Sequence, residues 1–406
     1  MSYTANLPVS FRGGVSEGVS THARITLLCL AALTIMSGAT VAPALPALQL
    51  HFSDVPNSEL LSRLVVSLPA LSIALCAPVA GIVSDRYGRL RLLLASLLLY
   101  GLSGIFALLQ ENLIGILASR LFLGVAVAGT MTSVTALVGD YFDRQQRLNH
   151  MSQQSAFISI GGVVFLTLGG LLADIHWRAP FAIYAMALLL IPTVVLFLWE
   201  PHRPHHAKQR VHIAEKPGNQ LPFSVLLAAA TLNSLAFYII PTQLPFYLKN
   251  LGISTPSLIA TAIAASNVMG AIASLLLYRR VGNLLGTLGV FIASFVIMAA
   301  GFTLIAISNT LAGVIIATSI YGLGMGTLIP HIFSTGLESA PESRRGRTAG
   351  ILTAGIFIGQ FISPLISQPW IQKFGFSSAF MSVAMVLLFA AMIGVMGQLL
   401  KNRNNH

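Results

Sequence analysis

Three of the few charged side chains in this sequence share one short segment. Asp85, Arg86 and Arg89 lie in the sequence Gly81-Ile-Val-Ser-Asp-Arg-Tyr-Gly88-Arg. Fixed charges of opposite sign on a short loop can hold neighbouring helices in one packing, and the two glycines permit a close helix approach and a tight turn. Arginines that only set membrane orientation would explain neither Asp85 nor the paired glycines. The segment therefore predicts a conformational latch.

Arg120 and His331 are ionisable side chains that we expect inside helices. Arg120 falls seven residues into a helix that should begin near residue 113, about 10 Å below its boundary. A buried cation is costly and is by default a functional hypothesis, here the attraction of an anionic or carbonyl-bearing substrate. The alternative is an arginine that snorkels to the interface. His331 is a candidate proton or substrate group, or else a packed histidine.

The composition places the chain in a membrane. Only 9% of its 406 residues are charged, 55% are apolar, and the mean hydropathy is +0.81, whereas a soluble domain carries about 25% charged residues. Two cysteines in apolar runs exclude a disulfide scaffold and a four-cysteine zinc site. The sequence shows no HExxH, GxSxG or P-loop pattern. We predict an all-α polytopic membrane protein that is not an enzyme and holds no metal or cofactor.

Uncharged runs of about 20 residues, the length that spans a bilayer as a helix, set the number of crossings. Strands of a membrane barrel would instead be about ten residues long with polar alternation, which the sequence lacks. We predict twelve transmembrane helices, over residues 25–48, 61–83, 92–109, 113–138, 151–173, 179–199, 223–247, 257–278, 285–306, 312–334, 347–370 and 376–399.

Loop charge orients these helices, because Lys and Arg in short loops stay cytoplasmic. With both termini inside, 18 of the 23 Lys and Arg fall on the cytoplasmic side. Arg63, Arg178, Lys249 and Lys373 fall on the other side, and Arg120 falls within a helix. The net charge of +11 is therefore a topology signal and predicts no nucleic-acid partner. We expect a multi-pass protein of the bacterial inner membrane with both termini cytoplasmic.

The chain divides into two halves of six helices. We predict a cytoplasmic tail (1–24), an N-terminal bundle (25–199), a cytoplasmic linker (200–222), a C-terminal bundle (223–399) and a second cytoplasmic tail (400–406). Both halves carry a basic loop between their second and third helices and a glycine-rich fourth helix. Parallel six-helix repeats suit a transporter that rocks about a site near the midplane of the membrane.

Three motifs resemble the major facilitator superfamily. Residues 81–91 resemble its GxxxDRxGR signature, Arg120-Leu-Phe-Leu-Gly124 its helix 4 arginine motif, and Trp177-Arg-Ala-Pro-Phe181 the helix 6 entry of its 12-helix drug/proton antiporter branch. The resemblance covers about residues 25–400. It implies that Asp85 faces the start of helix 11, that Arg89 pairs with Asp140 to stabilise an outward-open state, and that Arg120 controls a proton step.

The chain departs from that family in two places. Proton-coupled relatives commonly carry a carboxylate within helix 1, whereas no Asp or Glu lies mid-span here, so Asp140, Glu338 and His331 remain as proton carriers. Exporters often have a Gly-Pro kink in helix 5, and this chain has Phe165-Leu166 there.

Polar side chains on helices that should meet between the halves predict the substrate cavity. They are Asn233, Tyr238, Gln243, Asn267 and Gln360, each of which could instead bond to a neighbouring helix. Because the surrounding positions are aliphatic and aromatic, the cavity should suit a small amphipathic organic molecule. We predict a monomeric secondary transporter that exports such a solute, a drug or a secreted metabolite such as a siderophore, in exchange for protons. Proton-coupled import of a sugar or an organic acid is the alternative.

Overall fold

The computed structural model describes residues 19–201, 221–341 and 345–404, and every regular element in these ranges is a helix. The predicted linker falls mostly outside the described residues, as do most of the N-terminal tail and the last two residues of the chain. The N-terminal half contains α1 (Thr21–Ala39), η1 (Ala42–Ala44), α2 (Leu45–His51), α3 (Ser58–Tyr87), α4 (Arg89–Leu109), α5 (Leu113–Tyr141), α6 (Arg144–Ile175), η2 (Ala179–Ala185), α7 (Met186–Leu189) and α8 (Ile191–Phe197).

The C-terminal half contains two helical stretches that each cross the membrane twice. Its elements are α9 (Phe223–Asn250), α10 (Pro256–Ile272), the π-helical turn η3 (Ala273–Leu277), α11 (Tyr278–Ile307), α12 (Leu311–Ser339) and α13 (Arg345–Asn404). Gly286 (φ 66°) in α11 and Gly375 (φ 79°) in α13 have non-helical backbone. Positive φ is accessible to glycine at little cost, and the chain reverses direction at both points.

The predicted number of crossings is confirmed. Ten helical stretches of the described chain are long and apolar enough to span a membrane, and two of them, of 52 and 55 residues, are the stretches that turn at Gly286 and Gly375. Each of these two is a pair of spans, which brings the total to twelve. The protein is a multi-pass membrane protein.

Two predicted spans are irregular. The first is interrupted at residues 40–44, where Pro43 and Pro46 remove backbone donors, and it continues as η1 and α2. The sixth begins as the 3₁₀ helix η2, with Pro180 in its first turn, and restarts at α8 around Pro192. Hydropathy predicts that a segment spans the membrane but does not indicate where its backbone bends.

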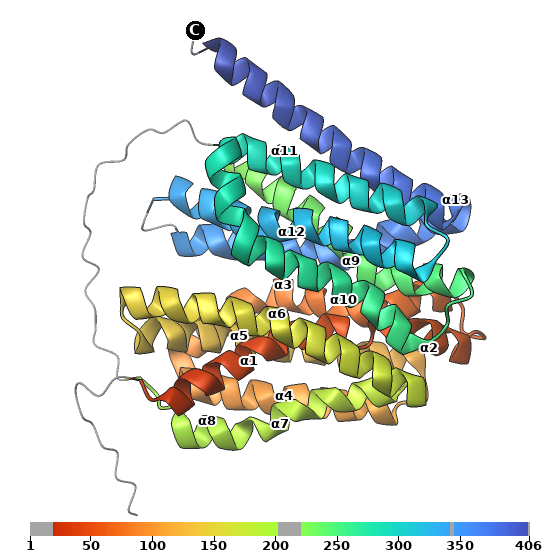
Figure 1. Ribbon diagram of the computed structural model, residues 1–406. Helices are drawn as coiled ribbons and strands as arrows, with labels where there is room; N and C mark the ends of the chain where they lie inside the picture. Colours follow the sequence, from red (N-terminus) through yellow and green to blue (C-terminus); the bar gives the residue numbers. More distant parts are fainter. Residues whose placement is uncertain (1–18, 202–220, 342–344, 405–406) are drawn as a thin grey trace, which may run out of the picture.

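The two halves lie side by side (Figure 1), with residues 19–201 in red to yellow-green and residues 221–404 in green to blue. Helix α3 packs on α13, and α6 packs on α10. We call the end that carries residues 86–91, 140–147 and 279–280 the basic end, and the end that carries residues 51–58 and 308–310 the opposite end. The basic end is on the left in Figure 1.

Candidate functional site

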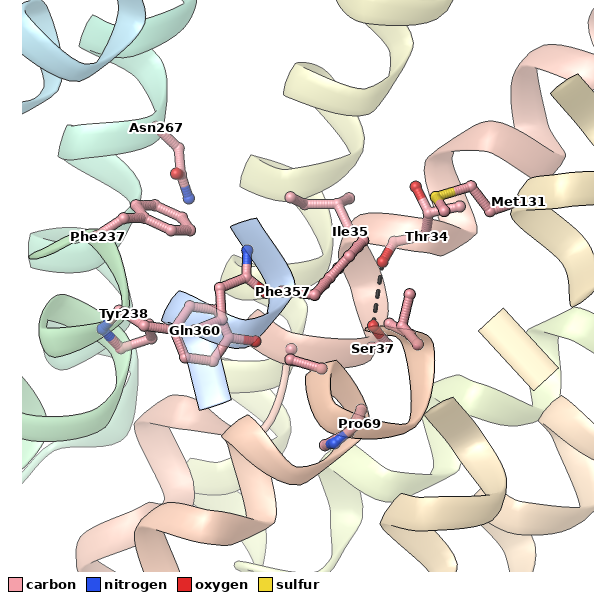
Figure 2. A pocket seen from close by; sticks show the side chains of 14 residues that line it. Thr34, Ile35, Ser37, Pro69, Met131, Phe237, Tyr238, Asn267, Phe357 and Gln360 are labelled. Atoms are coloured by element: carbon pink, nitrogen blue, oxygen red, sulfur yellow. Dashed lines mark hydrogen bonds between the residues drawn. The ribbon is translucent and has the colours of Figure 1, made fainter. Parts of the chain in front are cut away.

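A pocket of about 160 Å³ lies between the two halves. Figure 2 shows α1, α3 and α5 contributing one wall and α9, α10 and α13 the other. The wall from the N-terminal half consists of Thr34, Ile35, Ser37, Gly38, Pro69, Ala70, Ile73 and Met131, and the wall from the C-terminal half consists of Phe237, Tyr238, Pro241, Asn267, Phe357 and Gln360. None of these residues is charged, and three present aromatic rings.

The hydroxyl groups that line the pocket donate hydrogen bonds to backbone carbonyls. Thr34 donates to Ala31 O at 2.7 Å, and Ser37 donates to Thr34 O at 3.1 Å. The Tyr238 hydroxyl donates across the halves to Val66 O at 3.3 Å. These oxygens therefore offer lone pairs to a ligand, while the amides of Asn267 and Gln360 can supply both donors and acceptors.

Three of the five residues predicted for the cavity line this pocket, namely Tyr238, Asn267 and Gln360. Gln243 does not line it. Its side chain bonds to Arg63 and Ser367 nearer the opposite end. Asn233 is 1% exposed on α9, one helical turn on the basic side of Phe237, and its amide atoms have no hydrogen-bond partner within the described chain. The presence of a polar residue within a span therefore predicted that the residue is buried between helices. It did not predict which of these buried residues line the pocket.

A close approach between the halves narrows the pocket. A Cβ at Gly38 of α1 would lie 2.3 Å from the Tyr238 hydroxyl oxygen of α9. Glycine at this position allows Tyr238 to reach the N-terminal half. The sequence analysis did not identify Gly38, because its partner lies 200 residues away in the chain.

Arg120 lies behind the pocket wall rather than in it. Its side chain is fully buried, and its guanidinium carbon stands 4.9 Å from the Phe181 ring centroid and 4.7 Å from that of Tyr184. The Tyr184 hydroxyl reaches the carbonyl of pocket-lining Ser37 at 3.4 Å. Complete burial does not fit an arginine that snorkels to the interface. Arg120 is not among the residues that line the pocket, so its side chain would not contact a ligand bound there.

His331 likewise lies outside the pocket. Its Nε2 bonds to the carbonyl of Thr287 at 2.9 Å, directly after the turn at Gly286, and its ring contacts Phe291 at a centroid distance of 5.1 Å. These contacts correspond to the alternative of a histidine packed between helices. Glu338, another candidate proton carrier, accepts a hydrogen bond from Ser334 at 2.8 Å.

The residues predicted for the latch gather at the basic end. Arg89 at the start of α4 forms an ion pair with Asp140 at the end of α5. The pairing is the one that the family resemblance implied, but it is present here while the halves are joined at the opposite end. Gly88 between α3 and α4 has φ 105°, a conformation that glycine adopts readily. The carboxylate of Glu200, which the sequence analysis did not single out, accepts hydrogen bonds from the backbone N–H groups of Arg89 and Leu90, both at 2.8 Å.

The contact between Asp85 and the start of helix 11 that the resemblance implied is not among the contacts of the described residues, which omit 342–344 just before that helix. Asp85 and Arg86 are exposed, and within the described ranges Asp85 forms no hydrogen bond or ion pair. A Cβ added at Gly346 or Gly350 of α13 would meet open space, and Gly81 packs loosely on α5. Among the described residues, five hydrogen bonds join the two halves at or toward the opposite end. The halves are therefore tied together by hydrogen bonds at the opposite end.

Twelve spanning helices in two halves, with a pocket between them, are the architecture of a membrane transporter. The sequence profile of the Major Facilitator Superfamily matches residues 27–364 and also matches residues 226–405. The chain belongs to the Major Facilitator Superfamily.

Its relatives include named resistance proteins. It is 24% identical over 334 residues to "Multidrug resistance protein 1" of Bacillus subtilis, which covers 80% of this chain and 84% of the relative. It is 21% identical over 327 residues to "Quinolone resistance protein NorA" of Staphylococcus aureus, with the same two coverages.

Solved structures share the fold at low identity. A bacterial homolog of the human lysosomal transporter Spinster, in an inward-facing and occupied conformation, aligns with a TM-score of 0.73 at 15% identity over 95% of this chain and 98% of that one. The D-xylose-proton symporter aligns with a TM-score of 0.71, also at 15% identity, over 92% of this chain and 97% of that one.

Proposed function

We propose that this transporter exports a small amphipathic organic solute from the cytoplasm in exchange for protons. In this proposal the protein acts as a monomer in the bacterial inner membrane, and its basic end and both termini face the cytoplasm. The observation that carries the proposal is the central pocket, which both halves build from aromatic, aliphatic and uncharged polar side chains.

The chemistry of the pocket favours lipophilic and weakly cationic solutes. The hydroxyl oxygens of Thr34, Ser37 and Tyr238 present lone pairs, and the rings of Phe237 and Phe357 present electron-rich faces that attract organic cations. A polyanionic solute would need fixed cations, and Arg120 is separated from the pocket by Tyr184 and α1. The names of the two resistance proteins to which the chain is similar support export over import.

Proton coupling in this proposal acts through conformation. None of the residues that line the described pocket is a carboxylate, so a proton and a solute need not share one site. A proton that binds one conformation better than the other shifts the equilibrium between them, and Asp140 is the group we propose for this step.

Everted membrane vesicles with a respiration-acidified lumen test the proposal, with ethidium as the first probe and norfloxacin as the second. Export in exchange for protons predicts that the vesicles accumulate probe and that a protonophore abolishes this uptake. We expect Phe357→Ala, in the pocket, to reduce uptake at least fivefold. Phe374→Ala is the matched control, because this ring lies on the same helix, 47% exposed and outside the pocket.

Two results would contradict the proposal. One is the absence of gradient-dependent movement of either probe in vesicles that contain folded protein. The other is proton-driven uptake of a sugar or an organic acid into right-side-out vesicles, which would support the import alternative.

A further inference from the structure

Arg63 of α3 is a buried cation that the sequence placed in a surface region. It lies six residues, or about 9 Å along the helix, from pocket-lining Pro69 toward the opposite end. It is 3% exposed, and its Nε donates to the Gln243 side-chain oxygen of α9 at 2.7 Å. Its guanidinium carbon stands 3.8 Å from the centroid of the Phe246 ring. The C-terminal half therefore supplies both an acceptor and an aromatic face to a cation of the N-terminal half.

Gln243 connects Arg63 to a third helix. While its oxygen accepts from Arg63, its Nε2 donates to Ser367 Oγ of α13 at 2.8 Å. The side chain of Gln243 is fully buried. One amide thus bridges α3, α9 and α13, and both of its polar ends are used.

Carboxylates of the N-terminal half strengthen the same closure at two edges. The side chain of Glu59 accepts from Gln368 Nε2 and Gln372 Nε2 of α13, both at 2.8 Å. On the other edge, Asp174 at the end of α6 accepts from the backbone N–H of Ser257 at 3.0 Å, in the first turn of α10. Hydrogen bonds to charged groups are stronger than neutral ones.

We propose that Arg63, Gln243, Ser367 and Glu59 form a polar lock that holds the opposite end shut and favours the present conformation over its outward-open counterpart. When the halves separate there, water replaces Gln243 as the partner of Arg63. When they close, Gln243 accepts from Nε of a guanidinium that is removed from water, while Nη1 of Arg63 bonds within its own half to Gln49 and to the carbonyl of Glu59. Gln243 is accordingly the positioning residue of the lock.

Helix α3 carries the lock at one end and Asp85 at the other. A tilt of α3 relative to the C-terminal half that releases Arg63 from Gln243 would bring the other end of α3 toward α13. The lock and the latch are in this way alternative attachments of one helix. The inference rests on the alternating conformations of the proposed function and not on any particular solute.

Distance measurements between the halves test the lock without any substrate. Full-length protein in nanodiscs, with Cys29→Ser and Cys76→Ser, receives spin labels at Glu111→Cys and Asn309→Cys, which are exposed at the opposite end of the two halves. We expect Gln243→Leu to raise the ratio of long to short distances about tenfold or more, equivalent to about 1.4 kcal/mol. Thr327→Val is the matched control, because it removes a buried hydroxyl pair with Ser294, at 2.8 Å, within one half.

A double variant distinguishes the effect of the polar lock from a general loss of packing. Replacing both partners with apolar groups removes the unsatisfied cation, so Arg63→Met combined with Gln243→Leu should return the ratio toward that of the parent protein. If Gln243→Leu does not fold, Ser367→Ala, which frees the other end of the same amide, should shift the ratio severalfold in the same direction.

Unchanged distances in folded Gln243→Leu, or an equal shift in Thr327→Val, would overturn the lock. Because no solute is present, either result leaves the export proposal to be decided by the vesicle assay. Conversely, vesicles that fail to move ethidium or norfloxacin do not alter the distance prediction.

Discussion

Gly326 of α12 offers a stringent test of how the second wall of the pocket is held. A Cβ at this position would lie 2.0 Å from the carbonyl oxygen of Gly270 in α10. At Gly322, one turn earlier, a Cβ would lie 2.2 Å from the carbonyl oxygen of Ser266. Pocket-lining Asn267 stands between these two contacts on α10. The small residues therefore set the distance of Asn267 from the rest of the site.

The cost of Gly326→Ala follows from that geometry. The distance to the Gly270 oxygen is about 1.4 Å short of ordinary van der Waals contact, which begins near 3.4 Å. The clashing atom is backbone, so it cannot rotate away, and α10 and α12 must separate. Overpacking costs about 1–3 kcal/mol, and we expect a value near 3. For a unit of 150–250 residues, this corresponds to a fall in Tm of about 6–12 °C.

Thermal unfolding of the purified protein, followed by tryptophan fluorescence, measures this fall. Gly282→Ala is the matched control, because a Cβ at Gly282 meets nothing within 4 Å. Ethidium binding should weaken in Gly326→Ala, since Asn267 moves with α10. Equal Tm values for the two variants would refute the argument that α10 and α12 pack backbone to backbone through these glycines.

Two further predictions concern charged residues. Arg120→Lys should lower Tm more than Arg120→Met, because lysine keeps a buried charge but loses the planar stack on Phe181 and Tyr184; a more stable lysine variant in the same fluorescence melt would contradict this reasoning. Asp85→Asn should reduce probe transport at least tenfold while leaving Tm within about 1 °C, because Asp85 is exposed in this conformation and is expected to act in the other one; normal transport rates would count against the latch.

The spans could be predicted from sequence because each depends on a local property. Helices α4 and α5 begin and end within a few residues of the expected boundaries, since charges and turn residues bracket both. The predicted spans 285–306 and 312–334 are present as parts of α11 and α12. The turn at Gly286 lies near the predicted boundary between spans 257–278 and 285–306, where Arg279 and Arg280 interrupt the apolar sequence.

The site was predicted less completely, because its members come from helices that are distant in sequence. Buried polar residues identified Tyr238, Asn267 and Gln360, but the same criterion selected Gln243, whose partner is Arg63 of the other half. The sequence analysis placed Arg63 at the non-cytoplasmic surface of the membrane, because charges at the ends of spans usually lie in water. Besides acceptors at Glu59 and Gln49 in its own half, Arg63 has an acceptor in Gln243, 180 residues away, which no local pattern indicates.

The sequence by itself determined that this chain crosses a membrane twelve times in two related halves, because burial in lipid requires long charge-poor helices whatever their packing. Only the tertiary structure decided which polar groups meet between the halves. A hydrogen bond or a glycine contact depends on positions within a few ångströms across separate helices. The pairing of Arg63 with Gln243 and the approach of Tyr238 to Gly38 are consequences of how the two bundles are set against each other.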